Sequence, residues 1–457
     1  MRKASRLRTL PVTICAVVAI LLAPPVAVVG ASTNAAPAQP YLAAIDRPTE
    51  FPALAPVRVA VIDTGIDGDH PDFAGRIVAA RRFAPGNPLY PGTPHGTEVA
   101  GLIGAIDGNG EGIDGIAPNA RLLVGAVMGG ASQSYDTDSV ARAIRWAADD
   151  HARVINLSLA GLGPVPGYQQ AVDYALAHGA LVVAAAGNCF DRKFARCTPP
   201  GSEQAPAWLP HVLTVGATNG HSPAGFSIPS ARWVDLAAPG QLVTTLWPTR
   251  NNPYFATPDC AFLGTTSCYS TGGSQDRPWG ATGTSFATAM VSGAAAILFG
   301  ADPRLQPQQV AALLEETARP IFDPRHQAGA GQLDIGAALQ RVETGALPRA
   351  DYAEPNDRPD EAARLPSGVV QATLDWHDDP ADFYRLTLHR GSRLVVSTRG
   401  TARGTASVIS SSCRAPVASA TIGGTLRYIA RCSGPYLLRF VPRPGTRGAY
   451  SVFTKTR

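Results

Sequence analysis

Residues 57–67 read Val-Arg-Val-Ala-Val-Ile-Asp-Thr-Gly-Ile-Asp, and this stretch decides the fold class. Its first six residues are mostly apolar and β-branched, which is typical of a strand buried within a sheet. The run ends at Asp63, so a carboxylate follows directly on a buried strand. Four later runs have the same character, and we expect them to be further strands: 122–127, 154–159, 181–186 and 212–215.

Helical patterns separate these strands. Residues 138–147 place apolar side chains on one face, and residues 169–177 do the same before Gly179, a residue type that commonly ends helices. Strands that alternate with helices predict an α/β fold, with a mostly parallel sheet flanked by helices. Ligands of such sheets bind beyond the carboxyl ends of the strands, so a functional site is expected there.

A long run of small and apolar residues at 283–299 predicts a buried central helix. A membrane span is the alternative, but polar residues and Gly293 interrupt the run. It also falls short of the roughly 18 to 20 apolar residues that a span needs. Residues 305–317 predict a further amphipathic helix.

The pattern changes after residue 347. Residues 348–360 are rich in Pro, Asp and Glu and are interpreted as a linker, which ends a first domain over residues 57–347. Residues 361–457 contain about seven short alternating runs separated by turn residues, a pattern typical of a small C-terminal β-sandwich. We expect its strands at 369–374, 383–388, 394–398, 406–409, 426–430, 436–441 and 450–454.

The chain has 457 residues, of which 45% are hydrophobic and 16% are charged. This composition is too apolar for a disordered chain, and the length suits two domains. The formal net charge is +4, but residues 1–31 contain four basic residues and no acidic ones. Removing those four from the 39 basic residues leaves 35, equal to the 35 acidic residues. A neutral chain without basic clusters disfavours nucleic acid as the main partner.

The first 31 residues predict a secretory signal peptide. Four basic residues lie within 2–8, an apolar stretch spans 11–29, and the small residues that follow offer a cleavage site. An N-terminal membrane anchor is the alternative, which Pro24-Pro25 disfavours because proline interrupts a helix already short for a bilayer. We therefore expect a secreted or extracytoplasmic protein of the cell envelope, with no stable membrane span after signal cleavage. Residues 32–56 are interpreted as a short extended lead-in.

Cysteine usage also favours export. Loss of Cys15 with the signal peptide leaves six cysteines, an even number. By proximity they group as Cys189 with Cys197, Cys260 with Cys268, and Cys413 with Cys432. Such local pairs suit disulfides in an oxidising compartment, although proximity alone does not fix the pairing. Reduced thiols or a metal site are the alternatives, and the absence of Cys-x-x-Cys and of a histidine at zinc-finger spacing disfavours metal.

Four polar residues stand at predicted strand ends and helix starts. Asp63 ends the first strand, and His95 opens the apolar helical run 99–106. Asn188 follows the buried strand at 181–186, and Ser285 lies at the start of the buried central helix. Because these ends can meet at one edge of the sheet, we expect the four side chains to converge.

These residue types match the needs of acyl transfer. A serine hydroxyl is a poor nucleophile unless a base takes its proton, and histidine suits that task near neutral pH. A buried carboxylate fixes the imidazole tautomer, and an amide or a backbone N–H stabilises the oxyanion. Each residue alone has an ordinary structural explanation. Asp63 and Asn188 can be turn residues, His95 can be structural, and Ser285 can cap its helix. Only their combination is specific.

The sequence resembles the subtilases, the subtilisin-like serine endopeptidases, over about residues 57–342. The resemblance rests on four stretches: Val-Ile-Asp-Thr-Gly-Ile-Asp at 61–67, His-Gly-Thr-Glu-Val-Ala-Gly at 95–101, Ala-Ala-Gly-Asn at 185–188 and Gly-Thr-Ser-Phe-Ala at 283–287. Their order Asp, His, Ser is that of subtilisin. The resemblance implies that Asp63 orients the histidine, His95 is the general acid and base, Ser285 is the nucleophile and Asn188 donates to the oxyanion.

The same resemblance implies a secreted endopeptidase that hydrolyses peptide bonds through an acyl-enzyme intermediate and requires no cofactor. Its polypeptide substrate would pair as an added strand against an extended edge. That edge is formed by Leu157, Ser158, Leu159, Ala160 and Gly161.

Two departures from the family pattern are visible. Ala289 stands where the family often has proline, and Glu98 stands where many relatives have histidine. Since alanine is a good helix former, we expect the first departure to do little harm.

A short lead-in and the Gly-Thr-Ser-Phe-Ala form resemble the mycosins, subtilases linked to type VII secretion. That resemblance would make the type VII secretion apparatus a partner. Mycosins usually end in a membrane helix, whereas residues 450–457 are polar.

The C-terminal part resembles a second family, the bacterial pre-peptidase C-terminal domain. The resemblance rests on Glu-Pro-Asn-Asp at 354–357 and Asp-Phe-Tyr at 382–384, followed by alternating strands. Such β-sandwiches accompany secreted peptidases, and some are removed during maturation.

Structural calcium is a weaker expectation. Asp107 and Asn109 lie in the Gly-rich segment 107–114, which offers oxygen ligands where the resemblance places a calcium loop. An ordinary Gly-rich surface turn is the favoured alternative, and the spacing differs from an EF-hand.

Two rival functions are weighed. An aspartic protease needs two carboxylates that share a proton, but Asp63-Thr64-Gly65 is the only Asp-(Thr/Ser)-Gly here, so that class is rejected. The remaining rival is a catalytically inactive subtilase scaffold that acts as a binding or secretion-associated protein. It is disfavoured because all four chemical positions are filled.

Overall fold

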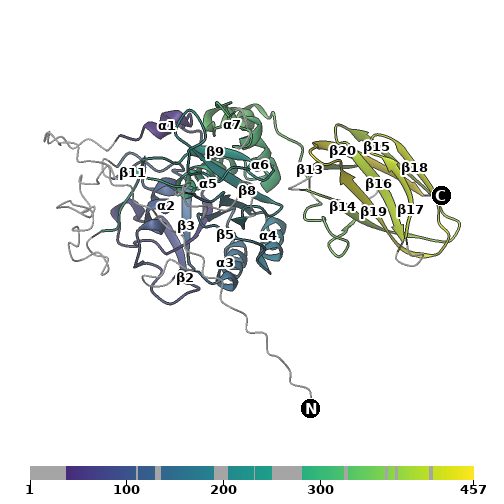
Figure 1. Ribbon diagram of the computed structural model, residues 1–457, viewed down its shortest axis with the longest axis horizontal. Coiled ribbons are helices and arrows are strands. Elements are labelled where there is room, and N and C mark those ends of the chain that lie inside the picture. The colour runs from purple at the N-terminus through teal and green to yellow at the C-terminus, as the bar shows by residue number, and fades with distance from the viewer. Residues whose placement is uncertain are drawn as a thin grey trace, which may run out of the picture.

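The computed structural model consists of an α/β domain and a β domain joined in one chain (Figure 1). It describes residues 38–109, 112–128, 135–189, 204–230, 232–249, 280–323, 328–351, 353–365, 369–375, 379–410 and 415–456. The predicted signal peptide, residues 1–31, lies outside the described residues.

A seven-stranded sheet with only parallel neighbours forms the centre of the first domain. The predicted strands are confirmed, and two edge strands are added. Strand β2 has mostly exposed side chains, and β9 is only four residues long, so neither forms a long apolar run. The spatial order is β2 (Ile77–Arg82), β3 (Ala120–Ala126), β1 (Val57–Asp63), β4 (Val154–Leu157), β6 (Leu181–Ala185), β8 (Val212–Thr218) and β9 (Leu236–Pro239).

Helices cover both faces of this sheet. The side chains of β1 show this, since successive residues of a strand point to opposite faces. Val59 and Val61 pack in the cluster that contains α2, α5, α6 and α7, whereas Ala60 and Ile62 pack in the cluster that contains α3 and α4. The first group is α2 (His95–Gly104), α5 (Thr284–Ala301), α6 (Pro307–Glu316) and α7 (Ile335–Thr344), and the second is α3 (Thr137–Asp149) and α4 (Tyr168–Ala177).

Short elements complete the first domain. A 3-10 helix, η1, spans Pro71–Phe73. Two small antiparallel pairs are β5 (Gly161–Leu162) with β7 (Gln204–Ala205), and β10 (Val243–Thr244) with β11 (Gly280–Ala281).

Helix α5 is the predicted central helix, and 17 of its residues are buried. Within the described part of the chain it is the one helix long and apolar enough to cross a membrane, and 94% of it is buried. It contacts α2 and the sheet strands β1, β3, β4, β6, β8 and β9, so it is a core helix of this domain. The interrupting Ser292 is satisfied there, because its hydroxyl donates a hydrogen bond of 2.9 Å to Asn156 Oδ1.

Part of the predicted lead-in packs onto the α/β domain. Helix α1 (Pro40–Ala44) buries Tyr41, whose hydroxyl donates to the Thr244 carbonyl at 2.9 Å. Ile45 is fully buried beside it. Residues 38–56 are therefore anchored to the domain rather than simply extended along it.

Two sheets form the C-terminal domain, as predicted. One has the order β12-β14-β19-β16-β17, the other β13-β20-β15-β18, and all pairs are antiparallel except β12 with β14. The seven predicted strands are present, and β12 and β17 are additional. The strands are β12 (Ala363–Arg364), β13 (Val369–Asp375), β14 (Asp382–Leu388), β15 (Arg393–Gly400), β16 (Gly404–Ser410), β17 (Ala415–Thr421), β18 (Thr425–Ile429), β19 (Gly434–Pro442) and β20 (Arg447–Thr456).

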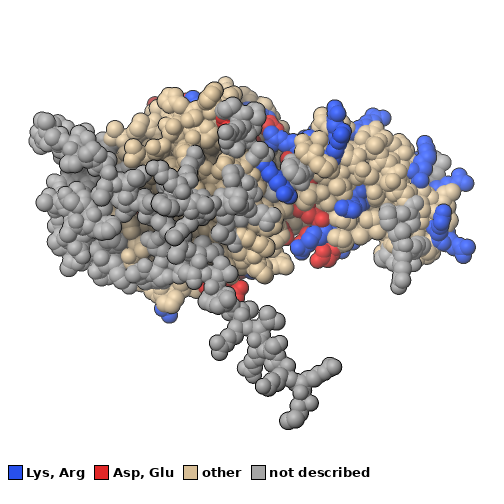
Figure 2. Space-filling model, viewed as in Figure 1, with Lys and Arg blue, Asp and Glu red and all other residues tan. Residues whose placement is uncertain are grey.

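The segment predicted as a linker, 348–360, takes part in the packing between the domains. Gln309 of α6 donates a hydrogen bond of 2.8 Å from its Nε2 to the Pro348 carbonyl. Asp351 and Asn356 of the same segment are 2% and 0% exposed. A further contact is the ion pair of 2.5 Å between Arg447 of β20 and Glu315 of α6. Figure 2 shows acidic side chains gathered where the two domains meet and basic ones over the C-terminal domain. The junction is therefore polar and partly buried.

The cysteine pairing stays a prediction. Cys189 and Cys432 lie in the described part of the chain, and Cys197, Cys260, Cys268 and Cys413 lie outside it.

The close packing of α5 makes Gly293 a sensitive position. A Cβ added there would lie 2.6 Å from the Cβ of Ile116, which is held by its own backbone. We expect Gly293→Ala to lower the free energy of unfolding by about 1–3 kcal/mol through overpacking, a loss that helix propensity only partly offsets. Urea denaturation measures this, with Ala301→Ser at the half-buried helix end as the control. An unchanged midpoint for Gly293→Ala would contradict the packing described for α5.

Candidate active site

Asp63 and His95 meet at the carboxyl end of β1. His95 Nδ1 lies 2.9 Å from Asp63 Oδ1 and 3.0 Å from Asp63 Oδ2. The Asp63 carboxylate is fully buried, and it also accepts a hydrogen bond of 2.7 Å from the Thr64 backbone N–H. The carboxylate thereby fixes the ring orientation and selects the tautomer that carries its proton on Nδ1.

The turn between β1 and α2 holds this pair in place. The Thr64 hydroxyl oxygen accepts a hydrogen bond of 3.0 Å from the Gly96 N–H. A Cβ at Gly96 would collide with the Gly65 carbonyl oxygen, so only glycine allows the start of α2 to approach the end of β1 this closely. His95 is the first residue of α2 and is therefore aimed back at Asp63.

Electrostatics favour the protonated form of His95. Burial lowers its pKa, but the negative charge of Asp63 and the hydrogen bond to it outweigh burial and raise the pKa to about 9. Its side chain keeps 24% exposure, so one edge of the ring remains accessible. The ring also packs beside Phe286, with centroids 5.9 Å apart.

Glu98 is a second acidic neighbour of His95. Burial and the nearby Asp63 raise the pKa of Glu98 to about 7, although the charge of His95 lowers it. The Glu98 charge in turn raises the pKa of His95. From the sequence, Glu98 is recognised only as a departure from the family pattern. Its effect on the pKa of His95 depends on its burial beside the Asp63–His95 pair, which only the structure shows.

Ser285 lies in the first turn of α5, where backbone N–H groups have no partner within the helix. Its hydroxyl donates a hydrogen bond of 3.1 Å to the Ser158 carbonyl, and the Ser158 hydroxyl donates 2.9 Å to the Ser285 carbonyl. Ser285 is 8% exposed. These reciprocal bonds fix the start of α5 against the segment that follows β4.

A buried polar chain supports Ser158 from below. Asn156 Nδ2 donates a hydrogen bond of 3.0 Å to the Ser158 hydroxyl oxygen. Ser292 lies about two turns after Ser285 in α5, and its hydroxyl donates to Asn156 Oδ1. Asn156 and Ser292 were not singled out from the sequence. Their polarity inside otherwise apolar runs is the signal that could have found them, since buried polar groups are normally paired.

Asn188 is exposed and follows the end of β6. Its Oδ1 accepts hydrogen bonds from the backbone N–H and the hydroxyl of Thr284, at 2.8 and 3.0 Å. Because the oxygen is used as an acceptor, the NH₂ group is oriented away from Thr284 and remains as a donor. Thr284 also accepts a hydrogen bond of 3.2 Å from the Gly187 N–H, so one threonine connects β6 to α5.

The predicted substrate-binding stretch runs beside Ser285. Leu157 ends β4 within the main sheet, and Ser158 and Leu159 are buried. Ala160 is half-buried, and Gly161 pairs with Ala205 through the β5–β7 ladder. The stretch thus connects the central sheet to a short antiparallel ribbon next to α5.

The weak calcium candidates have protein partners. Asp107 Oδ2 forms an ion pair of 2.7 Å with Arg47, and Asn109 Nδ2 donates 2.7 Å to Asp72. Gly108 N–H donates to Asp114 Oδ1 at 2.8 Å. Arg47 already places a positive charge beside Asp107, so these contacts give no support to calcium, and its binding at this loop stays a prediction.

Comparison with known proteins reveals a family match over most of the α/β domain. The family model described as Subtilase family matches residues 55–339. Fervidolysin of Fervidobacterium pennivorans is 35% identical over 311 residues, which cover 64% of this chain and 41% of fervidolysin. Subtilisin Savinase of Lederbergia lenta is 36% identical over 286 residues, covering 62% of this chain and 91% of that protein.

Solved structures of two mycosins are also similar. MycP1 with its N-terminal propeptide removed has a TM-score of 0.50 and 32% identity, covering 66% of this chain and 94% of MycP1. The MycP3 protease from the type VII (ESX-3) secretion system has a TM-score of 0.51 and 30% identity. The match covers 67% of this chain and 89% of MycP3.

The effect of the Glu98 charge on the pKa of His95 can be tested directly. Above pH 7 Glu98 is ionised, so it stabilises the imidazolium while His95 titrates. We expect Glu98→Gln to lower the pKa of His95 from about 9, measured as the midpoint of its imidazole NMR signals. Glu343→Gln, at an exposed position of α7, is the control and should leave the midpoint in place. A midpoint that rises, or does not move, in Glu98→Gln would show that the two groups are not coupled.

Proposed function

Because the chain belongs to the subtilase family, we propose that it is a secreted serine endopeptidase that uses Asp63, His95 and Ser285. The observation that carries the proposal is the His95 imidazole, bonded through Nδ1 to the buried Asp63 with one edge left accessible. In its neutral form, a histidine with that orientation can accept a proton at Nε2. The chain spans only 41% of fervidolysin, so its activity is inferred from these residues and not taken over from that relative.

In the proposed reaction, the Ser285 hydroxyl turns from the Ser158 carbonyl toward His95 when substrate binds. His95 Nε2 takes the hydroxyl proton while Ser285 Oγ attacks the scissile carbonyl carbon. Asp63 stabilises the resulting imidazolium, which fits the raised pKa of His95. The imidazolium then gives its proton to the leaving amine, and the acyl-enzyme is hydrolysed by a water that His95 activates in the same way.

Two donors would stabilise the tetrahedral oxyanion. One is the Asn188 NH₂ group, which Thr284 orients by occupying the amide oxygen. The other is the backbone N–H of Ser285, at the positive end of the α5 dipole. Both donors are fixed before substrate arrives, so the charge that develops on the carbonyl oxygen meets dipoles that need no reorganisation.

We further propose that the polypeptide substrate lies along Leu157–Gly161 as an added strand. The support is the position of this stretch, which is bonded to Ser285 at one end and enters the β5–β7 ribbon at the other. Strand addition binds main-chain groups, so sequence preference would come from side-chain pockets on either side.

Export is part of the proposal, because the basic and apolar N-terminus and the six cysteines both favour an oxidising compartment outside the cytoplasm. The cysteine pairs 189/197, 260/268 and 413/432 are the corresponding disulfide proposal. The likeness to the MycP1 and MycP3 proteases supports the type VII secretion apparatus as the setting for the substrate.

Covalent labelling tests the assignment of the nucleophile. A fluorophosphonate should modify Ser285 of the purified protein, identified by peptide mass spectrometry, and Ser285→Ala should not react. His95→Ala should label at least about a hundredfold more slowly, because the base that activates the hydroxyl is gone. Undiminished labelling of His95→Ala would refute the assigned base. Absence of labelling in the correctly folded wild type would favour the inactive scaffold instead.

Steady-state kinetics test the oxyanion donor. We expect Asn188→Ala to lower kcat by about 10²–10³ with a much smaller change in KM, because the amide acts on a charge present only in the transition state. Asn219→Ala, in an exposed turn of the same domain, serves as the control. A reduction confined to KM would assign Asn188 to substrate binding and not to the oxyanion.

A further inference from the structure

The C-terminal domain carries charge of one sign, although the total charge of the chain is small. Residues 383–457 contain twelve arginines and one lysine, and no aspartate or glutamate. The near-neutral total therefore combines a basic C-terminal domain with an acidic remainder. A domain with an excess of one charge attracts surfaces of the opposite sign, so this one is suited to an anionic partner.

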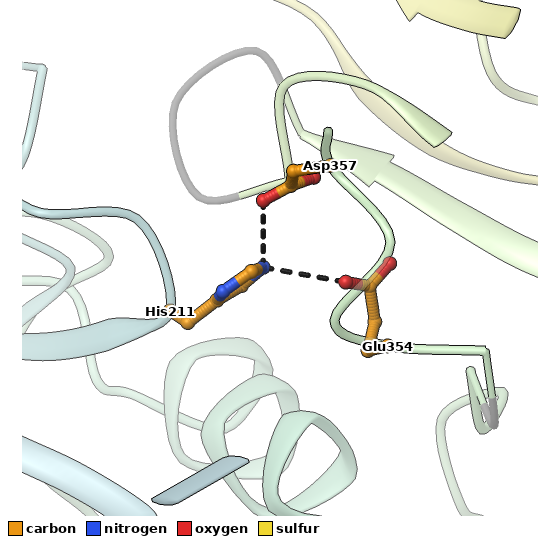
Figure 3. Close-up of side chains that lie close together, drawn as sticks. All are labelled: His211, Glu354 and Asp357. Carbon is orange, nitrogen blue, oxygen red and sulfur yellow. Dashed lines mark ion pairs between the residues drawn. The ribbon is translucent and has the colours of Figure 1, made fainter. Parts of the chain in front are cut away.

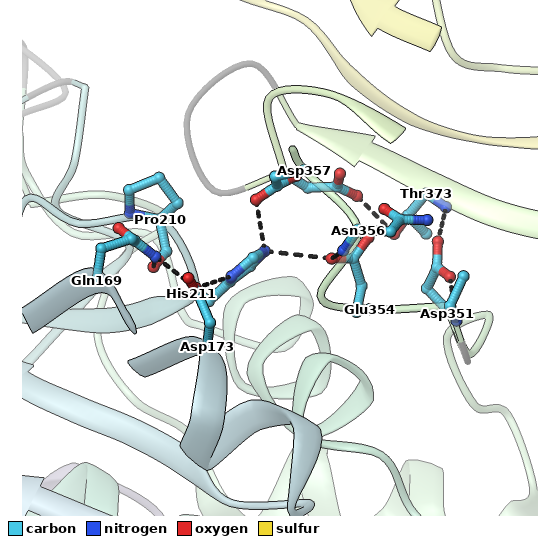
Figure 4. Close-up of polar contacts among 11 residues, drawn as sticks. Gln169, Asp173, Pro210, His211, Asp351, Glu354, Asn356, Asp357 and Thr373 are labelled. Carbon is cyan, nitrogen blue, oxygen red and sulfur yellow. Dashed lines mark hydrogen bonds and ion pairs between the residues drawn. The ribbon is translucent and has the colours of Figure 1, made fainter. Parts of the chain in front are cut away.

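The acidic residues that precede this stretch are engaged at the junction with the α/β domain. His211, which precedes β8, has its Nε2 3.1 Å from Asp357 Oδ2 and 3.4 Å from Glu354 Oε2 (Figure 3). On the other side of the ring, Nδ1 lies 3.4 Å from Asp173 Oδ1 of α4 (Figure 4). These ion pairs belong to the junction and do not involve the basic residues of the C-terminal strands.

The four-stranded sheet β13-β20-β15-β18 has one face that points away from the domain core. Along β15, Leu394 and Val396 are buried in the core, and the residues between them point to the opposite face. Arg447 at the start of β20 pairs with Glu315 of α6, so this end of the sheet meets the α/β domain. Lys455 lies eight residues further along β20, which is about 25 Å in an extended strand. The far part of the outward face is therefore distant from the junction.

Four apolar side chains form a line across this outward face, called here the apolar stripe. Val369 of β13 pairs with Phe453 of β20, and Val395 of β15 and Ile429 of β18 continue the line as diagonal neighbours. Val369, Ile429 and Phe453 are 62%, 57% and 48% exposed. They make up half of the six large hydrophobic side chains that are exposed among the described residues. Such grouping on one small face marks an interaction surface, whereas isolated apolar residues do not.

Basic side chains surround the apolar stripe. Val395 stands between Lys455 of β20 and Arg427 of β18 in the strand pairing, and Arg393 and Arg399 lie on the same face of β15. All four basic side chains are exposed, and the ion pairs of the described residues include none of them. They are spread over 63 residues of sequence without forming a basic run, so only the strand pairing brings them together.

An anionic lipid bilayer matches both parts of this surface. Its phosphate groups attract arginine and lysine, and the boundary between head groups and acyl chains accepts apolar side chains. A soluble polyanion offers the negative charge but no apolar region, so it would leave the apolar stripe in water. Apolar side chains in the middle of a basic, open face therefore favour a lipid surface as the partner.

We propose that the outward face of the sheet β13-β20-β15-β18 binds the surface of an anionic lipid bilayer. The apolar stripe enters the head-group boundary, and the four basic side chains around it contact lipid phosphates. The contact is peripheral and places no segment of the chain across the membrane. It goes beyond the proposed endopeptidase activity, because all of its residues lie outside the α/β domain.

Vesicle sedimentation of the full chain tests this proposal. The protein carries Ser285→Ala to prevent self-cleavage. It should bind vesicles of equal parts phosphatidylglycerol and phosphatidylcholine, and it should bind vesicles of phosphatidylcholine alone far more weakly. Added salt should release it, since salt screens the attraction between exposed charges.

Variants locate the binding face. Arg427→Gln combined with Lys455→Gln should lower the partition coefficient about 25-fold, because each basic side chain near an anionic surface contributes about a fivefold factor. Phe453→Ser should lower it about tenfold through loss of apolar contact. Circular dichroism checks that each variant is folded.

The matched control removes two positive charges from the opposite side of the domain. Arg385 of β14 and Arg439 of β19 are exposed on the outward face of the other sheet. Arg385→Gln combined with Arg439→Gln gives the same net charge as the test variant. It should keep the partition coefficient within about twofold of the parent, because charges more than a Debye length from the lipid are largely screened.

Three results would overturn the proposal. The first is the absence of binding to phosphatidylglycerol vesicles by the folded Ser285→Ala protein. The second is an equal loss in the two double variants, which would assign binding to net charge and not to this face. The third is unchanged vesicle binding by Phe453→Ser together with equally tight binding of heparin, which would assign the face to a soluble polyanion. None of these results bears on the fluorophosphonate labelling of Ser285, so the two proposals fail independently.

Discussion

The contact between His95 Nδ1 and the buried Asp63 carboxylate is the constraint on which the arrangement at the sheet edge depends. A fully buried carboxylate is costly unless it is paired, and His95 with the Thr64 N–H supplies the pairing. To make this contact, α2 must begin directly beside the end of β1, which the small Gly96 permits. The same contact stabilises positive charge on the ring, so one interaction supports both the local fold and the proposed chemistry.

Helix α5 begins at this edge of the sheet and runs through the core of the domain. Its apolar length is buried against the sheet strands, and that burial is the main stabilising contribution of the helix. Its polar residues are confined to contacts that the sheet provides, as when Ser292 meets Asn156. Since the helix cannot slide without breaking these contacts, Ser285 at its start is held in register with Ser158 and Asn188. A rigid core helix thereby positions the proposed nucleophile at the edge of the sheet.

The junction between the domains follows a different principle. The first domain is held mainly by apolar clusters, but the contact of the segment 348–360 with it consists largely of buried carboxylates around one histidine. Apolar contact is not directional, whereas a buried ion pair stabilises only when the distance and geometry of its groups are right. A polar junction of this kind can therefore make the position of the C-terminal domain depend on what neutralises its charge.

Local pattern was enough to predict most elements, because apolar runs and helical periodicity act within ten to twenty residues. It located β1, β4, β6, α3 and α5, and it named Asp63, His95, Asn188 and Ser285 as candidates. Edge strand β2 was not predicted, because its side chains are mostly exposed. Asn156 was not singled out, because no local pattern marks it as the partner of Ser292. Only the tertiary structure decided that Thr284 orients the Asn188 amide, across 96 residues, and that His211 faces Glu354 and Asp357. The physical reason is that hydrogen bonds and charge pairs depend on distance in space, and the sequence encodes that distance only through the packing of the whole chain.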